Sequence, residues 1–417
     1  MLQGRLWCRG SFIRFFVGAT FSVTGSWFNT VAIAVLTFRI TGQVSAAAGA
    51  IALSVVPRAI LGPLGGVVAD AFERRTSMIV IDVIRAVISL APLLVHDRST
   101  LWIVYTSVVL SQAASVFYGQ RAYVSALVPD DLLEGANAAV AIMLDVGLVA
   151  GASLASVLIG ALGPDPAFII NALSFAVSAG LLLTLPRARN VVESTQSTVS
   201  RMGALLWGYG AIIRRYPRVT ALYVGYAVNT TPIVFFQAVL VAYVAFLHQP
   251  LSFTGVLYAA AGVGGIVGGV AMGQYFKQLP YGVALSIFAS SVLLLGALAF
   301  ASGLWVALIL FALSTAAGTA GDVVVLVTIQ RLVASDEQGR AFGLLNWTSA
   351  LGQLLGAVLG LLLAKVAIAG LFWVSVIAFV IVVVSLTASA RAEPRRSTPL
   401  PLEVVVGVGN ATAMAAE

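Results

Sequence analysis

The sequence predicts an all-α integral membrane protein with twelve transmembrane helices in two pseudo-repeated halves of six. Of its 417 residues, 60% are hydrophobic and only 9% are charged, whereas soluble domains carry about 25% charged residues. Apolar runs of about 20 residues, long enough to span a bilayer as helices, recur along the whole chain. A water-soluble fold is therefore not expected.

The apolar segments form two sets of six. The first set covers about 12–38, 43–69, 76–95, 100–127, 137–160 and 166–185, and the second covers about 218–247, 251–276, 281–302, 304–331, 341–367 and 369–390. The basic N-terminus leads directly into the first segment. That segment is too long for the hydrophobic core of a secretory signal, so we expect it to be retained as a helix.

A more polar linker, residues 186–217, separates the N-terminal half (1–185) from the C-terminal half (218–390). Its second part predicts a short amphipathic helix on the membrane surface, with a partner-binding helix as the alternative. One helical face would carry Met202, Leu205, Leu206, Tyr209, Ile212 and Ile213. The Pro-containing tail, 391–417, is expected to be disordered.

Basic residues predict the orientation in the membrane. Arginines in the linker, near residue 75 and near both ends of the chain lie on one side, while the opposite loops hold only Arg39, Arg98 and Lys365. Cytoplasmic loops carry an excess of Lys and Arg. We therefore expect a multi-pass protein of the cell membrane with both termini in the cytoplasm.

An internal repeat supports the division into halves. The stretch LVPDDLLEGANA from Leu127 recurs loosely as LVASDEQGRAFG from Leu332. At nearly the same offset, Gly66, Asp70 and Arg74 have counterparts in spacing at Gly269, Gly273 and Lys277. Chance alignment of glycines is the alternative. Parallel repeats with a substrate site between them are typical of transporters.

The stretch GPLGGVVADAFERR, 62–75, contains the loop motif Gly-x-x-x-Asp-x-x-x-Arg-Arg as Gly66, Asp70, Arg74 and Arg75. With VPRAILGPLGG, IDVIRAV and ALVPDDLLEGANA, it makes the chain resemble the major facilitator superfamily. Within it, the chain resembles the drug-efflux branch of macrolide and siderophore exporters. The resemblance runs from about Phe12 to Leu386 and implies the major facilitator fold.

The same resemblance implies a conformational switch in this loop. The aspartate of the motif, here Asp70, would meet the positive N-terminus of the eleventh helix near 340–343 when the cytoplasmic side is closed. The chain departs from the family pattern at Ala71, where an arginine is usual. The fifth segment also lacks the proline common in drug/proton antiporters. Superfamily members often carry a basic residue in the middle of the fourth helix, but here the basic residue, Arg121, lies only at the end of that segment.

Five charged residues fall inside predicted membrane helices, where each needs a partner or a function because burial of a charge is costly. Asp82 and Arg85 are three residues apart on one helical face and close enough to pair. With Arg58, they are expected to form a structural ion network in the N-terminal half.

Asp145 and Asp322 have no opposite charge nearby in sequence. A carboxylate in a low-dielectric environment binds a proton more readily, so both are candidates for proton coupling. The alternative is a neutral acid that hydrogen-bonds a neighbouring helix. Asp322 is the first choice, because the resemblance places the tenth helix along the central cavity.

Polar and aromatic residues on the helices that line the family's cavity are the substrate candidates. They are Trp27, Asn29, Gln112, Tyr118, Tyr226, Asn229, Phe235, Gln237, Asn346, Trp347 and Gln353. A mostly apolar pocket with a few polar groups suits amphipathic organic molecules. The alternative for the aromatic residues is helix packing or contact with lipid.

The chain lacks a Walker loop, a GxSxG elbow and an HExxH sequence, so hydrolytic chemistry and ATP-driven pumping are not expected. Cys8 is the only cysteine and the two histidines are isolated, so we expect neither a metal site nor a cofactor. We predict a non-enzymatic secondary-active exporter of small amphipathic molecules, coupled to protons, monomeric and without nucleic-acid partners. An importer or lipid flippase on the same fold, or a membrane sensor, are the alternatives.

Overall fold

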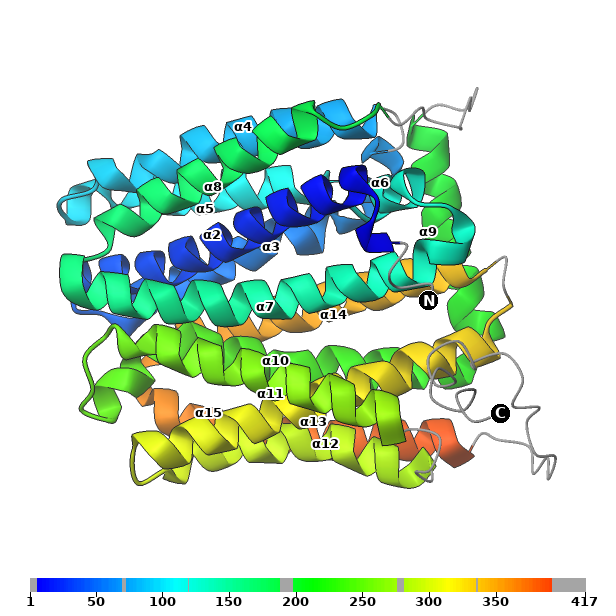
Figure 1. The fold of residues 1–417 in the computed structure, drawn as a ribbon. Coiled ribbons are helices and arrows are strands. Elements are labelled where there is room, and N and C mark those ends of the chain that lie inside the picture. Colours follow the sequence, from blue (N-terminus) through cyan, green and yellow to red (C-terminus); the bar gives the residue numbers. More distant parts are fainter. Residues whose placement is uncertain are drawn as a thin grey trace, which may run out of the picture.

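The computed structural model describes residues 6–69, 73–118, 120–187, 198–275, 281–334 and 337–391. Long helices run side by side in two layers (Figure 1). The N-terminal half contains α2 (Gly10–Thr41), α3 (Val44–Ala69), α4 (Arg74–Leu90), α5 (Leu101–Val116) with the short α6 (Gln120–Leu127), α7 (Asp130–Leu162) and α8 (Asp165–Leu183). The C-terminal half contains α10 (Pro217–Phe246), α11 (Phe253–Tyr275), α12 (Tyr281–Ala297), α13 (Leu304–Leu332), α14 (Gln338–Leu362) and α15 (Ala367–Arg391).

The predicted all-α membrane architecture is confirmed. Within the described residues, ten helices are long and apolar enough to cross a membrane, and the shorter apolar stretches Val146–Leu162 and Leu285–Phe300 lie in α7 and at α12. The single segment predicted at 100–127 is two helices in the structure, because the chain breaks between α5 and α6. Helix α5 ends at Val116. The sequence that follows is Phe117, Tyr118 and Gly119, and glycine is a poor helix former.

Local sequence explains where several helices begin and end. Gly42 follows α2 with φ 66°, a left-handed conformation that glycine adopts without strain, and its amide bonds the carbonyl of Phe38. The Glu73 side chain accepts hydrogen bonds from the amides of Arg75 and Thr76 and so caps the N-terminus of α4. Pro217 starts α10, a position where its missing amide hydrogen costs nothing.

The two halves meet along α3, which packs on α10 and α14, and along α7, which packs on α11. The linker helix α9 (Thr198–Arg215), the start of α2 and the end of α15 lie at one end of the bundle, here called the linker end (Figure 1). The opposite end is called the far end. Gly255 of α11 allows close approach there, because a Cβ atom at this position would collide with the carbonyl oxygen of Ala152 in α7.

The hydrophobic cores differ between the two ends. At the far end one cluster joins both halves and includes Phe28 of α2, Ala155 of α7 and Phe236 of α10. At the linker end the described residues form separate clusters, one around Phe15 and Met143 in the N-terminal half and one in the C-terminal half. Among the residues whose side chains are described, the halves are therefore packed against each other most extensively at the far end.

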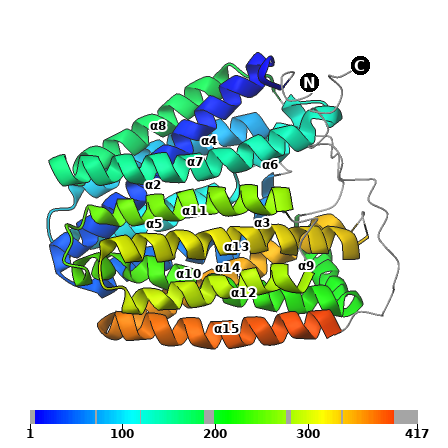
Figure 2. The same ribbon diagram turned by 60° about the horizontal axis from the view of Figure 1, so that its bottom comes forward.

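Helix α9 lies across the linker end of the bundle (Figure 1). Tyr209 and Ile212, from the predicted apolar face, are buried in the core of the C-terminal half, while Ile213 is exposed. The side chains of Met202, Leu205 and Leu206, and the tail beyond Arg391, lie outside the described residues. The colours of Figure 2 follow the chain from the helices of the N-terminal half through α9 to those of the C-terminal half.

Candidate functional site

A cavity of about 400 Å³ lies between the halves near the middle of the helices. Its size is within the range of about 300–1,000 Å³ typical of small-molecule sites. The lining side chains come from both halves: Ser26, Trp27, Thr30, Ile51, Ser54, Val55, Arg58, Gln112, Thr230, Ile233, Val234, Gln237, Tyr258 and Gln353.

Helical periodicity explains how each helix contributes. On α3 the lining residues Ile51, Ser54, Val55 and Arg58 are spaced three, four and seven apart, so they share one face. Trp27 of α2 meets Tyr258 of α11 across the boundary between the halves, with ring centroids 5.2 Å apart. The cavity therefore combines an aromatic wall with scattered amide and hydroxyl groups.

Four of the predicted substrate residues line this cavity. Trp27 and Gln112 do so from the N-terminal half, and Gln237 and Gln353 from the C-terminal half. Gln353 also donates a hydrogen bond to the hydroxyl of Ser349, at 3.1 Å. The three amides can each donate and accept hydrogen bonds, and none carries a charge.

The other predicted substrate residues lie elsewhere, because the rotation of each helix turns them into a core, toward a neighbouring helix or outward. Asn229 donates to the hydroxyl of Ser291 at 3.0 Å, inside the C-terminal half. Phe235 is completely buried in the far-end core, and Asn346 is exposed outside the cavity lining. Asn29 is also absent from the lining, and its amide oxygen is buried without a hydrogen-bond partner.

Tyr118 belongs to a polar cluster inside the N-terminal half. Its hydroxyl donates to the fully buried carboxylate of Asp82, at 3.1 Å. Arg85 lies 4.2 Å over the ring of Phe175 and donates to the hydroxyls of Ser111 and, at 3.5 Å, Ser26. Asp82 and Arg85 are near enough for their charges to attract, although no direct hydrogen bond joins these two described side chains.

Arg58 is separate from that cluster. It was expected beside Asp82 and Arg85, but α3 turns it into the cavity, where its side chain is exposed. Among the described residues none forms a hydrogen bond or ion pair with it. Its spacing from Ser54, one helical turn earlier, was the sequence signal that could have placed both residues on one polar face.

The two predicted coupling acids have different surroundings. Asp322 of α13 hydrogen-bonds the hydroxyl of Tyr226 in α10, whose ring stacks on Phe288 with centroids 6.2 Å apart. The structure thus brings together two residues predicted for different roles. Asp145 lies within α7, and its side chain is outside the described part of the structure.

The loop motif lies at the linker end. Gly66 is within α3, Arg74 begins α4, and Asp70 lies outside the described residues. Arg75 donates hydrogen bonds to the carbonyl oxygens of Leu182 and Leu183 at the end of α8. Since the last carbonyls of a helix have no partners of their own, Arg75 joins α4 to α8.

Trp347 lies at the contact between the halves rather than in the cavity. Its indole nitrogen donates to the carbonyl oxygen of Ala59 in α3, at 2.9 Å, and its ring stacks on Tyr209 of α9. Burial at this contact raises the pKa of Tyr209. Glu337, just before α14, accepts hydrogen bonds from Arg215 at 3.0 Å and Tyr216 at 2.7 Å.

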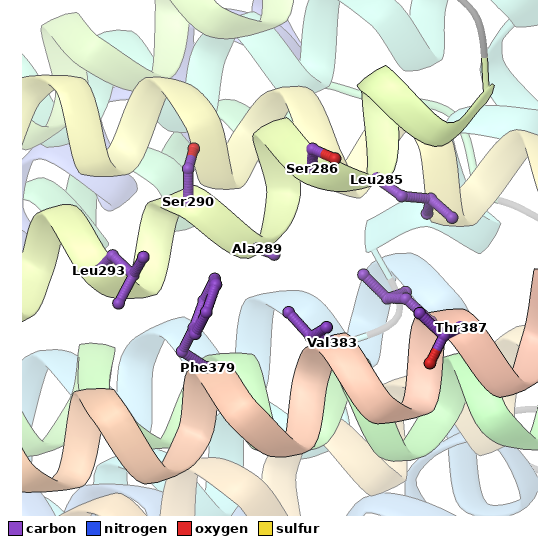
Figure 3. A pocket seen from close by; sticks show the side chains of 9 residues that line it. Leu285, Ser286, Ala289, Ser290, Leu293, Phe379, Val383 and Thr387 are labelled. Carbon is purple, nitrogen blue, oxygen red and sulfur yellow. The ribbon is translucent and has the colours of Figure 1, made fainter.

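A second pocket of about 350 Å³ lies between α12 and α15 (Figure 3). Leu285 and Leu293 of α12 face Phe379 and Val383 of α15 across it, and none of the described residues that line it is charged. Both helices belong to the C-terminal half. A site confined to one half cannot be opened to alternate sides by movement of the two halves, so the central cavity is the candidate site.

A polytopic membrane fold with a cavity shared by its two halves is that of a membrane transporter, not an enzyme. A profile of the Major Facilitator Superfamily matches residues 15–295. The chain belongs to this superfamily.

Individual relatives agree with this assignment. The uncharacterized MFS-type transporter YfiS of Bacillus subtilis (strain 168) is 24% identical over 360 residues, which cover 83% of this chain and 85% of that protein. A bacterial homologue of the iron transporter ferroportin, in an inward-facing state, has a TM-score of 0.70 at 16% identity, covering 90% of this chain and 98% of that chain. A peptide transporter POT in complex with sulfate has a TM-score of 0.73 at 12% identity, covering 91% and 94%. These structures share the fold.

Proposed function

We propose that the protein is a secondary-active exporter of small amphipathic organic molecules that works by alternating access. The central cavity carries this proposal, because both halves line it at mid-length with aromatic, aliphatic and amide side chains. Rocking of two such halves about a fixed site exposes the site to one side of the membrane at a time.

The orientation follows from the arginines at the linker end. By the positive-inside rule, this end and both termini lie in the cytoplasm. The protein spans the cell membrane as a monomer. In that orientation the core shared by both halves closes the outer side, where Ser156 of α7 also donates to the carbonyl oxygen of Ser252 at 2.5 Å. Substrate would then enter the cavity from the cytoplasm.

The loop motif is the proposed conformational switch. Asp70 would contact the N-terminus of α14 near 340–343 when the linker end closes, with Gly66, Arg74 and Arg75 positioning the loop. A contact made in only one state biases the equilibrium between states. Asp70→Asn is expected to slow cycling while substrate binding is retained, and lost binding with normal cycling would contradict this role.

Protons are the proposed coupling ions, with Asp322 as the first candidate carrier and Asp145 as the second. Asp322 lies in a membrane helix next to the Tyr226 hydroxyl, and ionisable groups at such positions commonly mark ion pathways. A carboxylate that binds and releases a proton during the cycle would link transport to the proton gradient.

Accumulation of fluorescent amphipathic dyes in cells with and without the protein tests the function. We expect lower accumulation in expressing cells, reversed when the proton gradient is collapsed. Higher accumulation would indicate import, and movement of labelled phospholipid alone would indicate a flippase. An unchanged signal across a broad dye panel, with the protein present in the membrane, would favour a sensor and refute transport of this class.

A further inference from the structure

We propose, resting on the transport function above, that the substrate carries a negatively charged oxyanion group such as a carboxylate, and that Arg58 binds this group in the central cavity. Arg58 is the only charged side chain among the described residues that line the cavity. It lies near mid-membrane on α3, where a charge without a partner is costly.

The missing countercharge is the main observation. No described acidic side chain forms an ion pair with Arg58, and its side chain lines the cavity. Burial of charge in low dielectric is normally offset by pairing and hydrogen bonding. An anionic ligand would supply both to Arg58, because a planar guanidinium can donate two parallel hydrogen bonds to a carboxylate.

Arg85 provides an internal comparison. It is also inside the membrane, but Asp82 lies beside it, Phe175 covers its guanidinium, and Ser26 and Ser111 accept its hydrogen bonds. Arg85 is therefore satisfied by the protein itself. Asp82, the acid expected to pair with Arg58, lies instead beside Arg85 and accepts a hydrogen bond from Tyr118.

The rest of the cavity suits an organic anion rather than an inorganic ion. Trp27 and Tyr258 form an aromatic wall that can bury an apolar body. Gln112, Gln237 and Gln353 add neutral donors and acceptors at other points of the wall. A cationic compound in the same place would meet Arg58 with no acid from the described lining to offset the repulsion.

The first experiment measures the charge that the cavity presents, without any assumption about the substrate. Ser54 lines the cavity one turn from Arg58, so Ser54→Cys places a reporter thiol there. The background is Cys8→Ser, because Cys8 is the only native cysteine and is exposed. The thiol is reacted with methanethiosulfonates that carry either a sulfonate or a trimethylammonium group.

We expect Arg58 to favour the sulfonate reagent, so that Arg58→Gln lowers the ratio of sulfonate to trimethylammonium rates by about 10-fold or more. Arg214→Gln is the matched control, because Arg214 is exposed on α9 and its side-chain hydrogen bond is to Gly210 of the same helix. An unchanged ratio in Arg58→Gln, or a thiol that reacts with neither reagent, would overturn the proposal.

The second experiment measures binding to the purified protein in nanodiscs. The probes are 1-pyrenebutyrate and its neutral methyl ester, detected by energy transfer from tryptophan. We expect the carboxylate to bind about 10- to 100-fold more tightly than the ester. Arg58→Gln should abolish this preference, and Arg58→Lys should retain part of it because it keeps the charge.

The native protein alone can refute the idea. Equal binding of acid and ester, or no binding of the carboxylate up to its solubility limit, overturns it even if Arg58→Gln fails to fold. Failure of the proposed export is distinguishable. In that case the dye-accumulation assay shows no transport, while the rate ratio and the carboxylate preference still depend on Arg58.

Discussion

The indole nitrogen of Trp347 donates a hydrogen bond to the carbonyl oxygen of Ala59, 2.9 Å away in the opposite half of the protein. In an unbroken helix this oxygen would accept from residue 63, but Pro63 lies inside α3 and has no amide hydrogen. Pro63 thus leaves the Ala59 carbonyl oxygen without its partner within the helix, and the Trp347 indole donates a hydrogen bond to it instead. The contact between the halves depends on this gap in the helix.

Trp347→Phe should therefore weaken the contact between α3 and α14, and so favour conformers in which these two helices are farther apart. Loss of one hydrogen bond costs about 1 kcal/mol, which corresponds to about a fivefold shift between conformers. Spin labels on Thr184→Cys and Ala388→Cys, both exposed at the linker end, would report the change as a longer-distance population. An unchanged distance distribution would contradict the idea that the Trp347–Ala59 hydrogen bond holds the two halves together.

Pro63→Ala tests the cause of that contact. The new amide can bond the Ala59 carbonyl within α3, so Trp347→Phe should have a smaller effect in this background than in the native chain. A double-mutant cycle measured with the same labels gives the coupling. Equal effects of Trp347→Phe in both backgrounds would show that the proline is not responsible.

Tyr209→Ala should loosen α9 from the bundle. Tyr209 is buried against Trp347, and truncation of a buried aromatic side chain costs about 3–5 kcal/mol. We expect faster hydrogen exchange of α9 amides, measured by mass spectrometry. Arg215→Ala is the comparison, since an exposed ion pair with Glu337 contributes only about 0–1 kcal/mol. Similar exchange in the two variants would count against the packing role.

Gly255→Leu should force α11 and α7 apart at the far end. Its Cβ atom would collide with the Ala152 carbonyl, and overpacking of this kind costs about 1–3 kcal/mol. We expect a lower Tm and faster labelling of Ser54→Cys by a reagent added from the far side. Gly180→Leu is the control, because nothing lies within 4 Å of a Cβ atom there. Equal loss of Tm in both variants would refute a specific effect at this interface.

Asp322→Asn should abolish transport driven by a pH gradient in proteoliposomes, because an amide cannot bind and release the coupling proton. Substrate counterflow, which needs no net proton movement, should continue. Asp165→Asn, at the exposed far-end start of α8, should leave driven transport unchanged. Full gradient-driven transport by Asp322→Asn would exclude Asp322 as the proton carrier.

The fold could be predicted because its signals are local. Apolar runs of membrane length, the polar linker and the motif at Gly66 to Arg75 specify helices, their order and the superfamily without knowledge of any long-range contact. Some helix ends also have a local cause, as with Gly42 after α2. The break between α5 and α6 was missed because Gly119, Gln120 and Arg121 interrupt the apolar run only briefly before apolar residues resume at Ala122.

The cavity could be predicted only in part. Trp27 and Gln237 line it, but Asn229, Phe235 and Trp347, chosen by the same reasoning, face a core or a neighbouring helix. Membrane helices are apolar on the side that meets lipid as well as on the side that meets protein. Hydrophobic periodicity therefore says little about their rotation.

Arg58 shows the difference most clearly. The sequence by itself determined that a charged residue lies within a membrane helix and needs a partner or a function. Only the tertiary structure decided that Asp82 accompanies Arg85 and Tyr118, and that Arg58 is turned into the cavity between the halves. The physical reason is that the length and polarity of a segment are properties of the chain, whereas the rotation of each helix is set by packing against its neighbours.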